Sequence, residues 1–329
     1  MRVLLYEWCS SGGLVGADPL IAREGRMMLE AVAADAAKES TLEVVVLVDE
    51  SRPLGLPPRT RRLEVSPGGD RAALVEAATG ADWTLIIAPE SDGILLDRVR
   101  ATRAAGGRVL ASADGVIATA ADKQATIDAL AARGVPVPAG RSLTAGERLP
   151  AGFALPAVRK ARGGCGCEAL EFVEDRDARP AALPTRVEPL VVGTPVGVSL
   201  IGGGGPATIL PPLRQRFTGG SAPRYRGAEL LADERATARA TALAARAAAA
   251  VGLDAGWAGV DLILGSRADG RDDRVLEINP RVTTSFVGLN RLFASSLVAA
   301  MIGAAQGERP PLVRAAAPVA AGSFDLLGD

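Results

Sequence analysis

The chain has 329 residues, 37 basic and 38 acidic side chains, a formal net charge of −1 and no histidine. A chain of this length can bury a large core in two or three lobes, and its balanced charge gives no electrostatic footprint for nucleic acid or an anionic membrane. The lack of histidine excludes Ser-His-Asp and Cys-His catalysis and any His-ligated zinc.

The first residues, the apolar runs and the cysteines indicate in which cellular compartment the protein is expected. The first apolar run, residues 1–6, is too short for a signal peptide, and no stretch reaches the ~18 apolar residues of a membrane span. The odd number of cysteines, three, is typical of a reduced environment. We therefore expect a cytoplasmic protein whose first residues form a strand.

Residues 1–115 alternate short apolar runs with amphipathic helical patterns. Such alternation predicts a parallel sheet with helices on both sides, and ligands of such sheets bind at the carboxyl ends of the strands. The loops at 7–13 and 89–93 are therefore candidates to contact substrates. The expected strands are 3–6, 43–48, 83–88 and 108–111, and the expected helices are 23–38, 71–78 and 95–105.

The chain changes character near residue 115. We expect a small mixed lobe over 116–185, a larger lobe over 186–306 and a loosely held tail over 307–329, which is rich in proline and alanine. The larger lobe is predicted to contain strands at 188–192, 197–201, 258–264 and 274–278 and helices at 233–251 and 285–305.

Two apolar runs in the larger lobe carry the most informative polar residues. Asp261 lies within one run, and Glu277 ends the other, followed by Asn279 and Arg281. If the runs are adjacent strands, three oxygen ligands converge on a site of the kind that suits Mg²⁺. Arg281 would then stand where it can neutralise a phosphoryl oxygen. The alternative is two amphipathic strands whose acids face water.

Further motifs precede this pair in a fixed order. Asp122-Lys123 opens a helical stretch, Lys160 ends an apolar strand, a glycine-rich segment covers 162–168, and Glu188 opens a second apolar segment. In this order the motifs resemble those of the ATP-grasp ligases over roughly residues 118–293. The resemblance implies an α/β ATP-grasp fold with an N-terminal Rossmann-like (pre-ATP-grasp) parallel-sheet lobe.

A narrower resemblance comes from the sequence Glu-Ile-Asn-Pro-Arg-x-Thr-Thr-Ser at 277–285 together with the N-terminal segments 6–13 and 88–90. These segments resemble the tyramine–glutamate ligase branch, which serves the biosynthesis of methanofuran-type carriers. The implied substrate residues are Tyr6, Glu7, Ser11, Glu90, Thr284 and Ser285, with Glu24 and Arg26 as further candidates. For Tyr6 and Glu24 the alternatives are packing and helix capping.

The ATP-grasp resemblance also implies nucleotide and metal ligands. ATP phosphates would contact Lys123, Lys160 and a loop with Gly163, Gly164 and Gly166, while Glu188 and the backbone of Leu190 and Val191 would hold adenine. Mg²⁺, with Mn²⁺ as an alternative, would bind Asp261, Glu277 and Asn279, and Arg281 and Lys160 would act on the transferred phosphoryl group. Taken alone, the loop is equally a hairpin turn, Lys160 an edge-strand lysine and Lys123 a surface helix lysine.

Several positions depart from the family pattern. An acid that binds ribose often lies seven residues after the Glu188 position, where this chain has Pro195, and Asp233 or Glu234 are candidates to replace it. An arginine found in some members two residues before Asp261 is Gly259 here, so Arg281, or Arg214 and Arg216, are candidates to supply its charge.

Three other residues are expected to have no role in catalysis. Cys165 and Cys167 lack the two further soft ligands of a metal site, and we interpret them as small loop residues, with a redox-sensitive disulfide as the alternative. Lys38, at the end of a predicted helix, is expected to be a solvated surface charge.

These patterns predict an ATP-dependent carboxylate–amine ligase that joins glutamate to tyramine, tyrosine or a similar amine through an acylphosphate. The alternatives are an ATP-grasp ligase for another amino acid, such as D-alanine, and a non-catalytic nucleotide-binding sensor. The expected partners are small molecules, with neither nucleic acid nor membrane. A homodimer is an alternative to a monomer.

Overall fold

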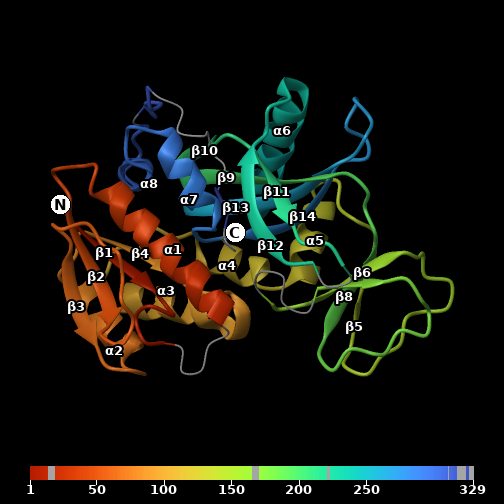
Figure 1. Cartoon of the computed structure of the whole chain (residues 1–329), viewed down its shortest axis with the longest axis horizontal. Coiled ribbons are helices and arrows are strands. Elements are labelled where there is room, and N and C mark those ends of the chain that lie inside the picture. The colour runs from red at the N-terminus through yellow and green to blue at the C-terminus, as the bar shows by residue number, and fades with distance from the viewer. Residues whose placement is uncertain (14–18, 165–169, 221–222, 310, 317–323, 326–329) are drawn as a thin grey trace.

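The computed structural model describes residues 1–13, 19–164, 170–220, 223–309, 311–316 and 324–325. Within them the strands form three sheets, which Figure 1 shows with the N-terminal sheet at the left, the small sheet at the lower right and the large sheet between and above them. None of the described helices is long and apolar enough to cross a membrane. The expected α/β architecture with an N-terminal parallel sheet is present, and the two sheets that follow it are antiparallel.

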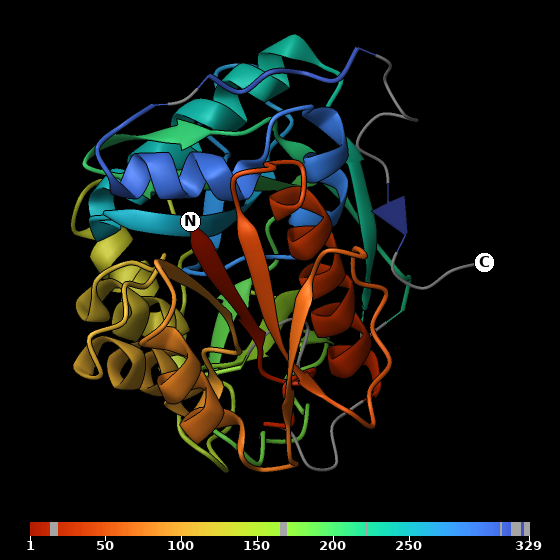
Figure 2. The same cartoon turned by 90° about the vertical axis from the view of Figure 1, so that its left-hand side faces the viewer.

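The N-terminal sheet is fully parallel and has the strand order β3-β2-β1-β4 (Figure 2). Helix α1 packs on one face with Val3 and Leu5, whereas α2 and α3 cover the other face with Leu4 and Tyr6, because successive side chains of β1 alternate. The elements are β1 (Arg2–Glu7), α1 (Pro19–Ala36), β2 (Glu43–Asp49), β3 (Arg61–Val65), α2 (Asp70–Ala78), β4 (Trp83–Ile87) and α3 (Ile94–Ala104).

One predicted strand in this lobe is wrong, and one strand was not predicted. The run at 108–111 forms only an isolated bridge between Val109 and Thr84, and the sheet takes its fourth strand from β3 instead. The sequence of β3 gave no apolar signal because it is an edge strand with exposed arginines at 61 and 62.

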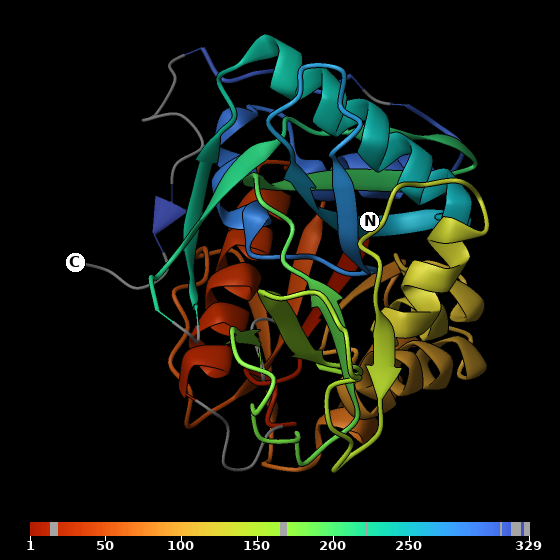
Figure 3. The same ribbon diagram turned by 90° about the vertical axis from the view of Figure 1, so that its right-hand side faces the viewer.

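The small sheet is antiparallel, with the order β5-β8-β6-β7, and lies below the large sheet in Figure 3. Two helices lead into it, and Asp122 caps the second by accepting hydrogen bonds from the N–H groups of Gln124 and Ala125 at 2.9 and 3.2 Å. The elements are α4 (Asp114–Ala120), α5 (Lys123–Ala131), β5 (Arg141–Leu143), β6 (Ala157–Ala161), β7 (Glu171–Val173) and β8 (Thr185–Pro189). The strand expected at 188–192 in the larger lobe is β8, which pairs with β5 and β6 in the small sheet.

The large sheet is antiparallel, in the order β14-β13-β9-β11-β12-β15, with β10 paired to β9. Helix α6 covers one face and α7 and α8 cover the other, where α1 also packs. The elements are β9 (Thr194–Gly203), β10 (Gly205–Ile209), β11 (Leu213–Phe217), β12 (Tyr225–Leu230), α6 (Glu234–Val251), β13 (Ala255–Leu264), β14 (Arg274–Asn279), α7 (Ser285–Leu289), η2 (Asn290–Leu292), α8 (Leu297–Ala305) and β15 (Phe324–Asp325).

The single helix expected at 285–305 is wrong, because the chain leaves the helical conformation between η2 and α8. Phe293 is extended, and Ser296 caps α8 by accepting a hydrogen bond from the N–H of Ala299. Buried Asp35 of α1 accepts hydrogen bonds from the Ser296 hydroxyl at 2.8 Å and from the Val298 N–H at 2.9 Å. These bonds replace helical ones and satisfy donors at the start of α8.

The expectation of a loosely held tail is wrong for two of its described parts. Phe324 is buried and pairs with Ala228 of β12, and Arg314 forms a bridge with Phe293. The N–H of Ala315 donates to the Leu292 carbonyl, and the Val313 carbonyl accepts from the Ala294 N–H. The tail therefore adds an edge strand to the large sheet.

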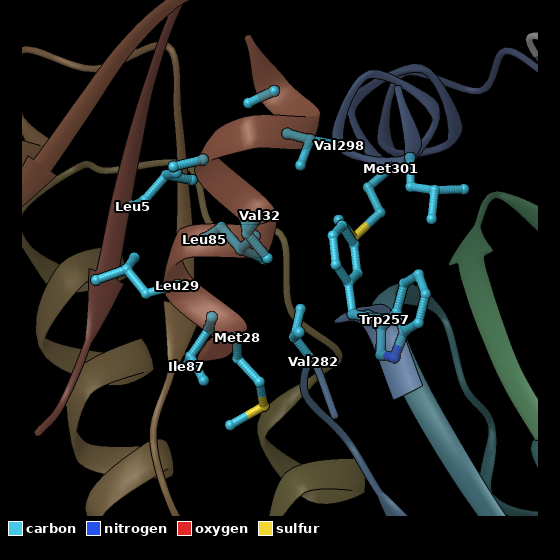
Figure 4. Close-up of a cluster of buried hydrophobic side chains, with 14 of the residues drawn as sticks. Leu5, Met28, Leu29, Val32, Leu85, Ile87, Trp257, Val282, Val298 and Met301 are labelled. Atoms are coloured by element: carbon cyan, nitrogen blue, oxygen red, sulfur yellow. The ribbon is translucent and has the colours of Figure 1, made fainter. Parts of the chain in front are cut away.

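Lys38 lies at the surface, as expected, but its charge is paired and bridges two lobes. Its ammonium group bonds Asp35 at 2.9 Å and the carbonyl oxygens of Asn290 and Phe293 at 2.6 and 3.0 Å. These contacts join α1 to the turn before α8. They lie beside a continuous apolar cluster that contains Leu29 and Val32 of α1 together with Val298, Met301 and Trp257 (Figure 4).

Candidate functional site

A cavity of about 540 Å³ lies where the three lobes meet. We call it the interlobe cavity. The N-terminal lobe contributes β1, α1 and the end of β4, the small lobe contributes Lys123, Lys160 and Leu170, and the large sheet contributes β9, β11 to β14 and the following turn. Its described lining residues are Glu7, Cys9, Leu20, Ile21, Glu24, Gly25, Met28, Ile87, Ala88, Pro89, Lys123, Lys160, Leu170, Gly197, Val198, Ser199, Gln215, Phe217, Arg224, Tyr225, Gly259, Asp261, Leu276, Glu277, Asn279, Arg281, Thr283, Thr284 and Ser285.

The two acids predicted to bind metal lie directly opposite each other on neighbouring strands. Asp261 of β13 is paired with Glu277 of β14 in an antiparallel register. One oxygen of Asp261 accepts a hydrogen bond from the Gln215 amide at 2.7 Å, and the other accepts one from the Asn279 amide at 3.1 Å. The convergence predicted for Asp261, Glu277 and Asn279 is therefore present in the structure.

The electrostatics of this acidic pair favour a bound cation. Burial and the neighbouring charge of Glu277 raise the pKa of Asp261 to about 7. Burial also raises the pKa of Glu277, but the charges of Lys123 and Lys160 outweigh it and leave that pKa below its ordinary value. Two close carboxylates with an amide oxygen beside them form the all-oxygen donor set that Mg²⁺ prefers, so these residues fit the ion. No cluster of three or more His, Cys, Asp or Glu side chains that could hold a metal ion occurs among the described residues, so a site here relies on the two acids and the Asn279 amide.

Two lysines of the small lobe stand beside the acids. The ammonium of Lys123, the first residue of α5, lies 3.4 Å from a Glu277 oxygen and donates to the Gly164 carbonyl at 2.6 Å. Lys160, in β6, forms a buried ion pair with Glu188 of β8 at 2.7 Å. Each lysine is thus already paired with a carboxylate, and a triphosphate would offer both of them a second anionic partner.

The residues predicted to hold adenine are not brought into the described lining of the cavity. The Glu188 carboxylate is occupied by Lys160 and by Arg186, whose Nε lies 3.1 Å away. The Leu190 N–H donates to the Pro156 carbonyl, and Val191 lines a separate hollow next to the β13–β14 hairpin. Gly163 and Gly164 follow β6 as expected, whereas Gly166, Cys165 and Cys167 lie outside the described residues.

Arg281 projects into the cavity and is held by Glu90 from the N-terminal lobe. The Arg281 Nε lies 3.1 Å from each Glu90 oxygen, and the Nη1 donates to the Val282 carbonyl at 3.2 Å. Gly259 leaves no room for the arginine that some family members carry, because even a Cβ there would approach the Thr283 methyl group to 2.8 Å.

The other proposed replacements for that charge point elsewhere. Arg214 pairs with Glu229, and Arg216 bonds the Phe324 carbonyl at 3.1 Å, while Gln215 between them faces the cavity. This arrangement follows from the two-residue period of β11. Asp233, suggested as a ribose ligand, is engaged as the N-cap of α6 through a bond from the Ala236 N–H.

The substrate residues predicted in the N-terminal lobe are divided between its two faces. Glu7 lines the cavity, but its carboxylate accepts bonds from the N–H groups of Cys9 and Ser10 and from the Ser10 hydroxyl. Burial raises the pKa of Glu7 despite these bonds. Tyr6 points to the opposite face and donates to Asp70 at 2.6 Å, and the Ser11 hydroxyl donates to the Leu47 carbonyl. Tyr6 and Ser11 therefore do not line the cavity.

Thr284 and Ser285, the predicted substrate residues of the large lobe, do line the cavity. The Ser285 hydroxyl lies 2.8 Å from that of Ser199 and 2.7 Å from that of Thr283. Two of these three hydroxyl groups, those of Thr283 and Ser285, follow Arg281 closely along the chain, and the third comes from Ser199 of β9, so together they form a polar wall between β9 and α7.

Sequence reasoning missed Gln215, Tyr225, Ser199 and Thr283. Tyr225 is largely buried, and burial together with the charges of Asp261 and Glu24 raises its pKa. These residues come from β9, β11, β12 and a turn, and β11 and β12 were not predicted as strands at all. The alternation of Leu213, Gln215 and Phe217 with two arginines was the signal that could have placed Gln215.

Sequence comparison agrees with this geometry. Residues 120–285 match the model of the ATP-grasp domain, and residues 42–117 match the model of the pre ATP-grasp 3 domain. No curated protein matches the chain.

Three solved structures illustrate the similarity of fold. An ATP-grasp superfamily protein from Archaeoglobus fulgidus superimposes with a TM-score of 0.71 at 21% identity, covering 97% of this chain and 95% of that one. The L-amino acid ligase from Bacillus licheniformis gives 0.69 at 14% identity and coverages of 92% and 73%. The D-alanine–D-alanine ligase from Bacillus anthracis, complexed with ATP, gives 0.62 at 16% identity and coverages of 92% and 97%.

The narrower resemblance to tyramine–glutamate ligases is not tested by these matches, whose identities are low enough to speak for fold alone. The domain match, by contrast, spans half of the chain and includes Lys123, Lys160, Asp261 and Glu277. The chain therefore belongs to the ATP-grasp domain family.

Proposed function

We propose that this protein is an ATP-dependent carboxylate–amine ligase that forms an amide through an acylphosphate. The observation that carries the proposal is the meeting of two metal-type acids, two lysines and Arg281 around one cavity formed by all three lobes. This set can hold a nucleotide triphosphate, a divalent cation and a carboxylate within reach of one another.

Within this proposal Asp261, Glu277 and Asn279 hold Mg²⁺, or Mn²⁺ in its place. The ion supplies positive charge at the phosphates and at the oxygens of the transferred group. Lys123 and Lys160 contact the phosphates from the small lobe, and Gly163 and Gly164 bring backbone N–H groups close to them. The hydrogen bond from the Gln215 amide holds the Asp261 carboxylate in its position beside Glu277.

The reaction needs no protein nucleophile, in keeping with a chain without histidine. An oxygen of the acid substrate attacks the γ-phosphorus, the bond to the β-phosphate oxygen breaks, and ADP and an acylphosphate result. The amine nitrogen then attacks the acyl carbon, phosphate leaves with the C–O electron pair, and the amine loses a proton. Arg281 stabilises negative charge on the carboxylate and on the phosphoryl group in both steps.

We further propose glutamate and tyramine, tyrosine or a similar amine as substrates, within the biosynthesis of a methanofuran-type cofactor. Support comes from the part of the cavity wall that belongs to the N-terminal lobe. It combines acidic Glu7 and Glu24 with apolar Ile21, Met28 and Ile87, surroundings that suit an amine with an apolar body. Tyr225 adds an aromatic ring from the opposite wall.

Phosphate release tests the proposal. The protein is incubated with ATP and Mg²⁺ and with pairs drawn from glutamate, D-alanine, other amino acids and aromatic amines. Release that requires both glutamate and tyramine supports the full proposal, and release with another pair supports only the ligase. Nucleotide binding without release with any pair would point to a sensor instead.

The variant Glu277→Gln provides the structural control for this assay. It should lower phosphate release at least ~1,000-fold, because one of the two cation-binding carboxylates is lost. The fold should persist, since the change also relieves the repulsion on Asp261. Full activity in this variant would remove the metal assignment.

A further inference from the structure

Glu90 and Arg281 form a nearly buried ion pair between two lobes that lie far apart in the sequence. Their side chains are only 6% and 12% exposed, and the Arg281 Nε lies 3.1 Å from each carboxylate oxygen. Glu90 follows β4 of the N-terminal sheet, whereas Arg281 follows β14 of the large sheet. The pair therefore fixes the end of one lobe against the end of the other.

The two residues of the pair differ in their access to the interlobe cavity. Arg281 lines the interlobe cavity, and Glu90 does not. The carboxylate holds the Nε side of the guanidinium, while the Val282 carbonyl accepts from Nη1. Contacts from two directions restrict a long side chain that would otherwise sample many rotamers.

The turn that carries Glu90 is itself fixed in an unusual conformation. Asp92 has a φ of 56°, in the left-handed region that residues other than glycine rarely adopt, and Gly93 follows with a φ of 70°. The N–H of Gly93 donates to the Glu90 carbonyl and that of Leu95 donates to the Pro89 carbonyl. This turn fixes the position of Glu90 relative to the end of β4.

We infer that Glu90 is a positioning residue for Arg281, and that it does not bind the ammonium group of a substrate. The inference rests on the proposed ligase function, in which Arg281 meets the acid substrate and the transferred phosphoryl group. Through this pair the N-terminal lobe sets the orientation of a guanidinium that belongs to the large lobe. A misplaced guanidinium would lose transition-state contacts, while nucleotide binding would continue because Lys123 and Lys160 belong to the small lobe.

A double-mutant cycle tests the inference. The variants are Glu90→Gln, Glu90→Asp, Arg281→Lys and the double variant Glu90→Gln/Arg281→Lys. Steady-state phosphate release is measured with ATP, Mg²⁺, glutamate and tyramine, or with the pair from the screen above that gives the fastest release. Calorimetry with a non-hydrolysable ATP analogue gives nucleotide affinity independently of turnover.

A matched control comes from the ion pair between Asp70 and Arg98. Both residues belong to the N-terminal lobe, as Glu90 does, and their side chains are 5% and 13% exposed. This pair packs next to Tyr6, on the face of the N-terminal sheet that is turned away from the cavity. Asp70→Asn therefore breaks an equally buried pair without touching the cavity. It measures what the loss of such a pair does to activity through stability alone.

We expect Glu90→Gln to lower kcat/KM for the acid ~100-fold, mainly through kcat, with analogue affinity within about threefold of the wild type. Glu90→Asp should recover most of the loss, and Asp70→Asn should stay within about threefold of the wild type. The double variant should be no less active than Arg281→Lys alone, because Glu90 acts only through Arg281.

Three outcomes would overturn the inference. The first is that the two single losses of kcat/KM multiply in the double variant, and the second is that Glu90→Gln raises only the KM of the amine. The third is that Asp70→Asn loses as much kcat/KM as Glu90→Gln does. A wild-type chain that releases no phosphate with any pair contradicts the proposed ligase, and the positioning role falls with it. An active wild type with multiplying losses contradicts the positioning role alone.

Discussion

The large sheet meets the N-terminal lobe and the small sheet in different ways, although helix α5 of the small lobe packs Leu130 into an apolar cluster of the large sheet. Its contact with the N-terminal lobe is a continuous apolar cluster from β1 and α1 through α7 and α8 to Trp257 of β13, with Asp35 and Lys38 at its edge (Figure 4). The small sheet has a buried cluster of its own around Leu143, Ala157, Val173 and Val187, and it reaches the cavity with two charged lysines.

This difference separates two tasks. Close packing resists displacement, so the wall formed by α1, β4 and the turn at 281–285 is held at constant shape. The pair of Lys123 with Glu277 joins the small lobe to the large sheet, whereas Lys160 pairs with Glu188 inside the small sheet, and an anionic ligand would offer both lysines a second partner. The packed interface shapes the substrate side of the cavity, and the polar interface supplies its charge.

The largest expected effect is the loss of packing at the apolar interface. Trp257→Ala removes a fully buried ring that packs on Phe286 with ring centroids 5.0 Å apart, and it should lower the free energy of unfolding by ~4 kcal/mol. Urea titration followed by circular dichroism measures the change. Val192→Ala, at a side chain 81% exposed beside the small sheet, should change it by less than ~0.5 kcal/mol. Similar values for both variants would contradict the contrast between the interfaces.

The second prediction addresses the polar interface through activity. Lys160→Ala should lower kcat/KM at least ~100-fold by removing a preorganised cation, while Glu188 keeps Arg186 as a partner and the fold persists. Lys123→Ala should mainly weaken the binding of an ATP analogue. Steady-state phosphate release and calorimetry separate the two effects. A Lys160→Ala protein with wild-type kinetics would remove that lysine from the site.

Lys38→Ala provides the converse test at the packed interface. Loss of three hydrogen bonds between α1 and the turn before α8 should cost ~2 kcal/mol in the free energy of unfolding. The kcat/KM should stay unchanged, because Lys38 lies outside the cavity. An activity loss equal to that of Lys160→Ala would show that the two interfaces do not divide their tasks as described.

The smallest expected effect is a pH dependence of the polar site. Burial and Glu277 raise the pKa of Asp261 to about 7, above its unfolded-state value. Its contribution to stability is therefore fully present below that unfolded value and is lost as the pH rises through about 7. Metal-free protein should lose on the order of 1 kcal/mol per pH unit between about pH 5 and pH 7.

Urea unfolding in the presence of a chelator measures this slope, and Asp261→Asn should flatten it. Glu277 acts in a different window, because its pKa is lowered. Its stabilising contribution is lost only as the pH falls toward its folded pKa, in the acidic range. An identical slope in wild type and Asp261→Asn would assign the pH dependence to other groups.

Predictions from the sequence succeeded where a residue's role depends on its immediate neighbours. The pairing of Asp261 with Glu277, the helix start at Asp122-Lys123 and the parallel N-terminal sheet were all predicted from sequence patterns. Predictions failed where the role of a residue depends on which face of the sheet its side chain points to or on which residue of another strand it contacts. Tyr6 and Glu7 are adjacent in sequence, and only one of them faces the cavity.

Local sequence patterns were sufficient to predict the fold class, the two acids and the order of the charged motifs, because short periodic runs indicate strands and helix starts. The folded structure was needed to show that Glu90 holds Arg281, that Glu188 is occupied by Lys160 and Arg186, and that Lys38 joins two lobes. The pair of Lys160 with Glu188 joins neighbouring strands of the small sheet, while the contacts of Glu90 with Arg281 and of Lys38 with Asn290 join lobes across long stretches of chain. In these two long-range contacts nothing in the local sequence of either partner specifies the other, since the partners meet only after the lobes have packed.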